Sequence, residues 1–302
     1  MFLAIDHGNK QIKTIHHTFS SGLYESSTKP PFGKNVLFYQ DKYYTLSDQR
    51  IPYMRDKTAD ERFFVLTLFA IAFEFRDMLL SEHPVKLQLG IGLPPAHYGT
   101  LYQKFEAYFL NRGVIDFQID GRAYSILITS ATCFPQAYAA VVPVYQQVQQ
   151  SPKTVVIDIG GFTADYLQLK YGEVDLSVCD SLENGVILLY NRIRSRVNAE
   201  YDLLLDESDI DAVLKGAAQP AGLVQQIVLA EAQSFVDDLL GKLRERMIDL
   251  RSGYTVFAGG GAALLRRQLA SSERIGQAAF VEEISANVKG YELLYRASMI
   301  GG

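Results

Sequence analysis

A four-residue pattern, Ile-Asp-x-Gly, occurs twice in this 302-residue chain, at residues 5–8 and 157–160. The two copies are 152 positions apart, which is half the length of the chain. In both, a short apolar run leads to the aspartate and a β-prone run follows the glycine, as in AIDHGNKQIKTI and VIDIGGFTADYL. Such a repeat indicates an internal duplication, and about 150 residues suits one domain, so we expect two related halves.

Each copy predicts a strand, a tight turn and a second strand. The turns fall at Gly8-Asn9 and Gly160-Gly161, residues that tolerate the positive φ of hairpin turns. Because glycine has no Cβ, a ligand can reach the backbone there, and exposed amides suit phosphate oxygens. Asp6 and Asp158 at the turn mouths would repel phosphate directly, but they suit a hydrated Mg²⁺. Either turn alone could be an ordinary hairpin, whereas two at matching offsets favour a phosphate cradle.

Two further features fit phosphate or nucleotide binding. Lys13 lies seven residues after Asp6, an odd offset that crosses the turn, so its ammonium could return to a phosphate; Lys10 is the local competitor. A predicted strand over 255–258 runs into Gly259-Gly260-Gly261 and then a helix over 262–269. Three glycines let a backbone approach phosphate, ribose or base at a helix N-terminus, whereas packing would explain one glycine more easily than three.

Composition and missing motifs exclude several classes. The chain has no GxxxxGK[ST] and no GxGxxG after a strand, so P-loop and Rossmann interpretations lose their main support. A net charge of −5 argues against direct nucleic-acid binding. Cys133 and Cys179 lack disulfide or metal spacing and indicate a reducing cytoplasm. The apolar run 63–73 is about half the ~20 residues that a membrane span needs, so we expect a buried helix.

The remaining pattern is that of an α/β protein. Strands are expected at 86–93 and in two hairpins, around Gln40-Asp41 and Asp120-Gly121. Helices are expected over 59–80, 98–110, 184–197 and 223–249.

The motifs together resemble a known superfamily. Residues 6–13 and 158–165 look like the two phosphate motifs of the actin, Hsp70 and sugar-kinase superfamily, and 257–262 its adenosine motif. Residues 134–140 and 285–292 resemble its two connecting segments, and all five occur in the family's order. The chain is most similar to the bacterial plasmid-segregation actin-like ATPases of the ParM/StbA type, on IDIGG-x-T-x-D, the 53–68 stretch with Asp56-Lys57-Thr58, and Leu93-Pro94-Pro95.

This resemblance implies an α/β, actin-like fold with two RNase H-like lobes around a central nucleotide cleft. The first lobe would comprise residues 1–147 plus 286–302, with a small β-rich insertion at about 33–57. The second would comprise residues 148–285, with a mostly helical insertion at about 186–250.

The resemblance also implies site residues, carried over by motif. Asp6 and Asp158 would hold Mg²⁺ through water, and ATP or ADP would be bound by Gly8, Asn9, Lys13, Gly160, Gly161, Thr163, Gly185, Gly259, Gly260 and Gly261. Gln136 stands where members place a Gln or Glu that orients the attacking water; a glutamine can position but not deprotonate, so turnover would be slow. Asp165 would support the water network or serve only structurally. Gly185 would lie near ribose, with a helix start capped by Asn184 as the alternative.

The implied function is a cytoplasmic ATPase that forms filaments and drives plasmid DNA segregation. Its partners would be further copies of itself and a DNA-binding adaptor, with no direct nucleic-acid contact and no membrane. Three alternatives keep the fold: a small-molecule kinase resembling type III pantothenate kinases, which share the Asp-x-Gly-Asn opening, a non-polymerising actin-like ATPase, and an Hsp70-like clamp. The clamp is disfavoured because 302 residues leave no room for a peptide-binding domain.

Overall fold

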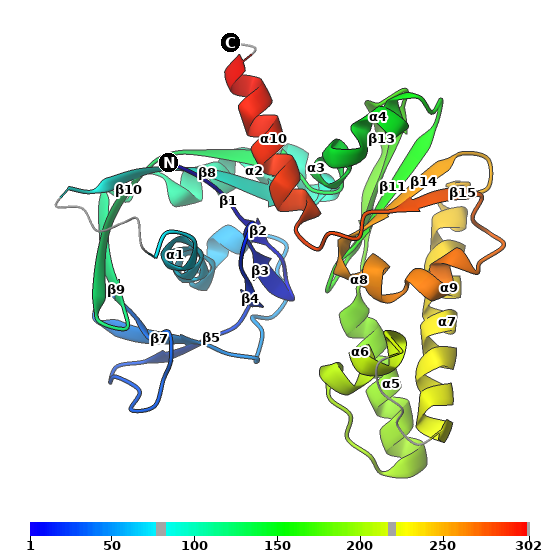
Figure 1. Cartoon of the computed structure of the whole chain (residues 1–302), viewed down its shortest axis with the longest axis horizontal. Coiled ribbons are helices and arrows are strands. Elements are labelled where there is room, and N and C mark those ends of the chain that lie inside the picture. Colours follow the sequence, from blue (N-terminus) through cyan, green and yellow to red (C-terminus); the bar gives the residue numbers. More distant parts are fainter. Residues whose placement is uncertain (77–82, 217–221, 301–302) are drawn as a thin grey trace. The chain divides into compact units, whose positions relative to one another are not determined.

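The chain forms two compact units. The structure is a computed structural model that describes residues 1–76, 83–216 and 222–300. One unit is Met1–Val142 with Asn287–Gly302, and the other is Pro143–Ala286 (Figure 1). The first boundary falls before residue 147 because α4 (Tyr145–Gln149) packs on the second unit. The Tyr145 hydroxyl donates to the Gly172 carbonyl at 3.4 Å, and the Tyr254 hydroxyl bonds Gln147 Oε1 at 3.4 Å.

The first unit is built on a seven-stranded sheet in the order β1-β8-β10-β9-β6-β7-β5. Its strands are β1 (Phe2–Ala4), β5 (Leu23–Ser26), β6 (Leu37–Tyr39), β7 (Lys42–Leu46), β8 (Val85–Leu93), β9 (Val114–Ile119) and β10 (Arg122–Pro135). Strands β1, β8 and β10 run parallel, and the remaining pairs are antiparallel. A smaller sheet contains β2 (Asp6–His7), β3 (Gln11–Lys13) and β4 (Thr18–Ser20). The carboxyl ends of β1 and β10 therefore lead directly into the first hairpin and the first connecting segment.

Two of the predicted hairpins are confirmed in sequence position and turn geometry. Gln40 and Asp41 join β6 to β7 with φ of 49° and 59°. Asp120 and Gly121 join β9 to β10 with φ of 50° and 81°. Positive φ at both central residues is the type I′ arrangement that matches strand twist.

The helices of the first unit cover and fill this sheet. They are α1 (Arg62–Glu74), α2 (Pro95–Phe109), α3 (Tyr138–Val141) and α10 (Ala286–Ile300), with 3-10 helices at Lys57–Ala59 and Val142–Val144. Helix α1 lies inside the curve of the strands (Figure 1), and all residues from Phe63 to Ala72 are buried, as expected of a helix that is apolar all round. It ends at Glu74; the expected continuation over 77–80 lies outside the described residues.

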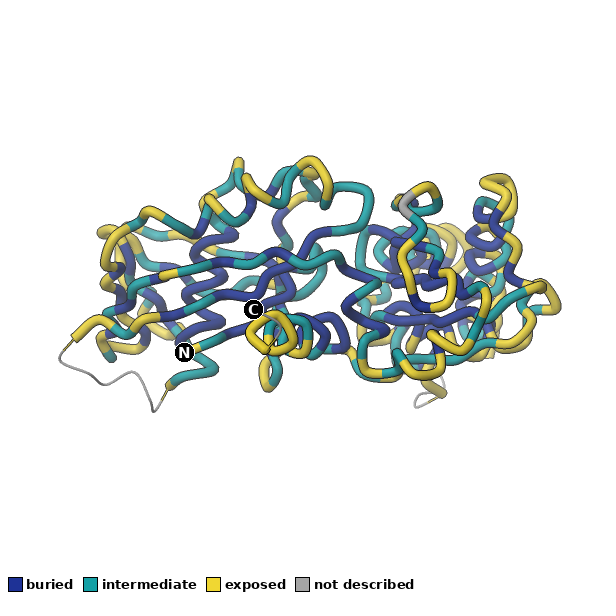
Figure 2. The backbone as a smooth tube through the Cα atoms, turned by 90° about the horizontal axis from the view of Figure 1, so that it is seen from above, coloured by how far each residue is buried: buried dark blue, intermediate teal, exposed yellow. Residues whose placement is uncertain are grey.

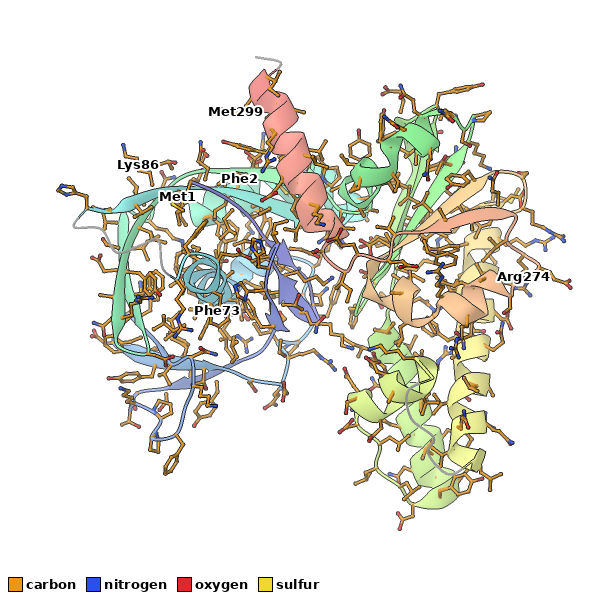
Figure 3. The ribbon with its side chains drawn as sticks, in the orientation of Figure 1. Met1, Phe2, Phe73, Lys86, Arg274 and Met299 are labelled. Atoms are coloured by element: carbon orange, nitrogen blue, oxygen red, sulfur yellow. The ribbon has the colours of Figure 1, made fainter. Side chains whose placement is uncertain are left out.

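Helix α10 returns to the first unit at its parallel edge. Phe2, labelled in Figure 3, stacks on Tyr295 with ring centroids 4.0 Å apart. At Gly290, a Cβ would overlap the carbonyl group of Ala139, so the helix backbone rests directly on α3.

The second unit is built on a five-stranded sheet in the order β13-β12-β11-β14-β15. Its strands are β11 (Thr154–Ile159), β12 (Ala164–Lys170), β13 (Glu173–Leu182), β14 (Tyr254–Ala258) and β15 (Gln277–Phe280). Its helices besides α4 are α5 (Val186–Tyr201), α6 (Glu207–Leu214), α7 (Gly222–Glu245), α8 (Gly259–Leu264) and α9 (Arg266–Ala270). Strands β11, β14 and β15 are parallel. Each unit has its own buried core (Figure 2).

One expectation about this unit is wrong in detail. The three glycines do not precede the helix but form the first turn of α8, and the helix breaks at Leu265 before α9. Gly259, with φ of +87°, turns the chain from β14 into the helix, a conformation that only glycine adopts readily. Among the described residues, none of the helices is long and apolar enough to cross a bilayer.

Candidate functional site

The first hairpin places Asp6 and Lys13 directly opposite each other. They are register partners of β2 and β3, and Lys13 Nζ lies 3.6 Å from Asp6 Oδ2. Asp6 is buried, with 4% of its surface exposed. Gly8 keeps a negative φ, contrary to expectation. Its need for glycine is steric, since a Cβ would lie 2.5 Å from the Gln11 carbonyl oxygen.

Gln136 reaches the same carboxylate from the end of β10. Its backbone amide donates to the Leu93 carbonyl at 2.8 Å, and its side-chain Nε2 donates to Asp6 Oδ1 at 2.8 Å. Asp6 thus accepts from an amide and faces an ammonium, although 130 positions separate it from Gln136. The structure therefore brings together Asp6, Lys13 and Gln136.

A strained turn follows Gln136 immediately. Ala137 has φ of 61° and ψ of −50°, and the Tyr138 amide donates to the Gln136 carbonyl at 2.6 Å, which makes a γ-turn of the rare, strained kind. The buried Ala137 amide donates to Asn287 Oδ1 at 3.1 Å at the start of α10. Such strain costs about 1–3 kcal/mol and persists where its surroundings fix it. Asn287 therefore helps to hold the backbone that presents Gln136.

Two buried residues beside the first hairpin, Lys57 and His7, are neither glycine nor aspartate, so the glycine and aspartate motifs do not predict them as site residues. Lys57 Nζ donates to the His7 carbonyl and lies 5.5 Å from the centroid of the Phe63 ring. His7 Nε2 and Thr67 Oγ1 are 2.8 Å apart, and Thr67 itself donates to the Phe63 carbonyl. The proton between the two side chains therefore belongs to His7 Nε2. Burial, and to a smaller extent the charge of Lys57, lowers the pKa of His7 to about 3.

The second hairpin repeats the arrangement of the first within the other unit. Asp158 on β11 is the register partner of Asp165 on β12, and both are buried. The Gly160 amide closes the turn by donating to the Thr163 carbonyl at 2.8 Å. Thr163 Oγ1 donates to Asp165 Oδ2 at 3.4 Å. Neither Gly160 nor Gly161 has a positive φ, so here too the expected backbone conformation is wrong.

The three glycines of α8 have different surroundings. A Cβ on Gly259 would overlap Asp158 Oδ1, and one on Gly261 would lie 2.5 Å from Ile159 Cγ2 and 2.8 Å from Val186 Cγ1. A Cβ on Gly260 would meet nothing within 4 Å. Two of the glycines are therefore explained by packing, and Gly260 is the one whose backbone faces open space.

Gly185 is explained by contact with the second hairpin. A Cβ there would overlap the Gly161 carbonyl, and its amide donates to the Phe162 carbonyl at 2.8 Å. The next amides, of Val186 and Ile187, donate to the carbonyls of Gly160 and Gly161. Gly185 is the N-cap residue of α5, and Asn184 does not cap with its side chain, whose oxygen accepts from Lys242 Nζ at 2.6 Å. The first turn of α5 thus fixes the hairpin.

The donor chemistry fits an ion held through water. Among the described residues there is no group of three His, Cys, Asp or Glu side chains that could ligate a metal directly. Asp6 and Asp158 are instead single buried carboxylates, each at a strand end beside a glycine turn. Mg²⁺ keeps several waters and commonly binds through one or two carboxylates plus phosphate oxygens, so these residues suit it.

Two family models match the chain, one in each half. Residues 4–138 match the N-terminal domain of actin-like proteins, and residues 156–271 match the C-terminal domain of the archaeal actin homologue MreB-like. No curated protein sequence matches the chain.

Solved structures match the chain over nearly its whole length. The archaeal actin homologue Ta0583 is 19% identical, with a TM-score of 0.77 over 98% of this chain and 99% of that one, and it has also been solved in complex with ADP. The ParM protein of psk41 is 18% identical, with a TM-score of 0.69 over 99% and 98% of the two chains. An AlfA filament bound to AMPPNP is 14% identical, with a TM-score of 0.63 over 100% and 98%.

The fold is therefore that of actin, and the chain is an actin-like protein. Its similarity extends to archaeal and bacterial actin homologues alike.

Proposed function

We propose that this chain binds and hydrolyses ATP and assembles with ATP into filaments. The observation that carries the proposal is the group formed by Asp6, Lys13 and Gln136, in which a buried carboxylate, an ammonium and a side-chain amide meet. ADP and AMPPNP in structures of the same fold support a nucleotide as the ligand.

The ATP of this proposal is bound by glycine turns and by the starts of helices. The hairpins with Gly8, Asn9 and Lys13 and with Gly160, Gly161 and Thr163 bind its phosphates, and Gly185 and Gly260 approach the nucleoside. Asp6 and Asp158 hold Mg²⁺ through water. A bound Mg²⁺ neutralises phosphate charge and stabilises the charge that develops on phosphoryl oxygens.

Gln136 positions the attacking water and is held in place by its neighbours. A neutral amide donates and accepts at once, so it can orient a water beside the metal-bound phosphate without removing its proton. Asp165, tied to Thr163, supports the water network from the other hairpin. We therefore expect slow hydrolysis of ATP. The filament should then persist for longer than one catalytic turnover.

Filament assembly is the proposed consequence of nucleotide binding. Filament structures of AlfA and Alp12 share this fold, which supports assembly of this chain with copies of itself. We further propose DNA segregation, through an adaptor protein that joins filament ends to plasmid DNA, because the net charge of −5 disfavours direct DNA contact.

The test measures phosphate release and light scattering together, at tens of micromolar protein with ATP and Mg²⁺. Hydrolysis without any added metabolite, accompanied by scattering, supports the proposal. Hydrolysis without scattering would indicate a non-polymerising ATPase. Turnover only in the presence of an acceptor metabolite would favour the kinase alternative.

A further inference from the structure

The Asp56-Lys57-Thr58 turn lies beside the first glycine hairpin, and the function proposed above gives it no role. Lys57 is only 5% exposed, which is rare for a lysine, and its ammonium donates to the backbone carbonyl of His7. The two residues are 50 positions apart in the sequence. A buried ammonium needs groups that accept its protons, and one such group here belongs to the hairpin backbone between Asp6 and Gly8.

Neighbouring contacts fix the turn that carries Lys57. Asp56 caps this 3-10 turn, because its Oδ1 accepts from the Thr58 amide at 3.0 Å and from the Thr58 hydroxyl at 2.6 Å. Asp56 Oδ2 also accepts from Lys104 Nζ of α2 at 2.5 Å. Lys57 Nζ lies 5.5 Å from the centroid of the Phe63 ring at the start of α1. The turn is therefore tied to both helices, and the lysine side chain is held against the hairpin.

The side chain of His7 is held as firmly as its carbonyl. His7 is completely buried, and its Nε2 donates to Thr67 Oγ1 of α1 at 2.8 Å. Its ring meets the ring of Phe105 of α2 edge to face, with centroids 5.7 Å apart. Residue 7 is thus anchored at the side chain by α1 and α2 and at the backbone by Lys57.

The direction of the His7 carbonyl sets the direction of the Gly8 amide. Both groups belong to one peptide unit, which is trans, and in a trans peptide the C=O and N–H bonds point in opposite directions. Because the carbonyl faces Lys57, the Gly8 N–H points away from Lys57. Glycine accepts positive and negative φ about equally, so the backbone at residue 8 would also tolerate the reversed peptide. Lys57 therefore selects one of two orientations that the backbone allows.

We propose that Lys57 is a positioning residue, which holds the peptide between His7 and Gly8 so that the Gly8 amide can donate to a phosphate oxygen of the nucleotide. This inference rests on the ATP binding proposed above, and it names the residue that prepares the first hairpin for phosphate. Backbone amides of such turns bind anions, whereas a reversed peptide would present a carbonyl oxygen that repels phosphate.

The first test compares ADP with adenosine, which has no phosphate, on the full chain. Lys57→Met keeps a long apolar side chain and removes the donor. We expect its ADP affinity, measured by isothermal titration calorimetry, to fall by about 10-fold and its adenosine affinity to stay within about 2-fold of the wild type. Lys42→Met, which removes the exposed partner of Glu25 in the same unit, is the matched loss of a cation and should bind ADP as the wild type does.

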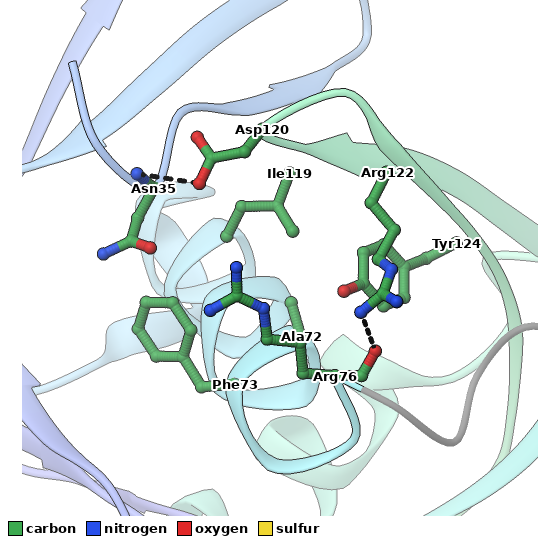
Figure 4. A pocket seen from close by; sticks show the side chains of 8 residues that line it. All are labelled: Asn35, Ala72, Phe73, Arg76, Ile119, Asp120, Arg122 and Tyr124. Carbon is green, nitrogen blue, oxygen red and sulfur yellow. Dashed lines mark hydrogen bonds between the residues drawn. The ribbon is translucent and has the colours of Figure 1, made fainter.

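The outcomes separate this inference from the proposed function. Unchanged ADP affinity in Lys57→Met, or an equal loss of ADP and adenosine affinity, would overturn the positioning role and leave ATP binding in place. A wild-type chain that binds no ADP would contradict the proposed function and this inference with it. A pocket at the other end of α1, lined in part by Phe73 and Tyr124 (Figure 4), contains none of these residues, so ADP bound there would have the same affinity for both chains.

A second measurement does not depend on the folding of the variant. In the wild type, hydrogen exchange of the Gly8 amide, followed by NMR with isotope-labelled glycine, should slow by at least about 10-fold with saturating ADP and stay unchanged with adenosine. This protection should be absent from Lys57→Met at saturating ADP, whereas a loss of charge alone would leave it in place. Equal exchange of the wild-type Gly8 amide with and without ADP would overturn the proposal.

Discussion

Gln136 donates a hydrogen bond from its side-chain amide to Asp6 at 2.8 Å, and this bond joins the end of β10 to the first glycine hairpin. Strand β10 and the turn at Ala137 hold the glutamine, while the β2–β3 pair holds the aspartate. The residue proposed to orient water thus touches the residue proposed to hold the metal. A substitution of either residue should therefore alter the position of the other.

Replacing Gln136 by alanine should separate hydrolysis from assembly. The variant keeps both carboxylates and both hairpins, so we expect ATP-dependent assembly to remain and phosphate release to slow by about 10²-fold, the usual cost of a misplaced reactant. Phosphate release and light scattering are measured on the same sample. Gln103→Ala, on the exposed face of α2, is the control. Normal hydrolysis by Gln136→Ala would contradict the water-positioning role.

Replacing Asp158 by asparagine should abolish Mg²⁺-dependent turnover. Asparagine keeps the size of the side chain but removes the charge that attracts a divalent cation, so ATP turnover should fall to background at every Mg²⁺ concentration tested. Asp180→Asn, on the exposed part of β13 in the same unit, should behave as the wild type. Full activity of Asp158→Asn would show that the second carboxylate has no metal role.

Alanine at Gly259 should lower stability, whereas alanine at Gly260 should leave stability nearly unchanged and weaken ADP binding. Gly259→Ala forces a Cβ onto Asp158 at a φ of +87°, so we expect it to lower the free energy of unfolding by about 2–4 kcal/mol. Gly260→Ala adds a methyl group to open space within a helix, so its stability should change by less than about 1 kcal/mol. ADP affinity should fall in Gly260→Ala. Thermal unfolding and ADP titration of the two variants distinguish packing from ligand contact.

The stability of the chain should fall with acid through His7. Because the folded pKa of about 3 lies below the unfolded value of 6.5, only the unfolded chain binds the proton between these values. The free energy of unfolding therefore rises with pH in that window, by about 1.4 kcal/mol per pH unit from this residue, and the contribution is complete above pH 6.5. His7→Gln keeps a donor for Thr67 but does not titrate, so its urea midpoint should depend less on pH.

The matched control for His7 is the exposed His16. Its hydrogen bond to Glu74 raises the pKa of His16, so its contribution to stability is present below its ordinary pKa and declines as the pH rises through the folded value. His16→Gln should therefore leave the acid-side loss of stability in place. An unchanged pH dependence in His7→Gln would show that His7 does not stay neutral and buried in the folded chain.

Much of the fold was predictable because its signals are local. The type I′ turns at Gln40-Asp41 and Asp120-Gly121 depend on residues that accept positive φ, and the run 63–73 is too short to span a membrane and too apolar to be exposed. The offset between Asp6 and Lys13 likewise predicted that Lys13 lies on the far strand of the first hairpin, and the β2–β3 register makes the two residues direct partners.

The remaining features depend on contacts between distant segments. No local pattern distinguishes Gly259, which rests on Asp158, from Gly260, which faces open space. The amide of the strained Ala137 donates to Asn287, 150 positions away, and Lys57 donates to the His7 carbonyl, 50 positions away. Gly8 was expected for its φ and is instead required by the close approach of the Gln11 carbonyl oxygen, whereas a Cβ on Gly160 would lie 3.3 Å from the Thr163 carbonyl oxygen.

Sedimentation of the wild-type chain with Mg²⁺ and ATP, AMPPNP or no nucleotide, with electron microscopy of the pellets, tests the central proposal most directly. We predict filaments with ATP and with AMPPNP, none without nucleotide, and none for Asp158→Asn. A chain that stays monomeric at tens of micromolar with either nucleotide, under several salt conditions, would contradict nucleotide-dependent assembly.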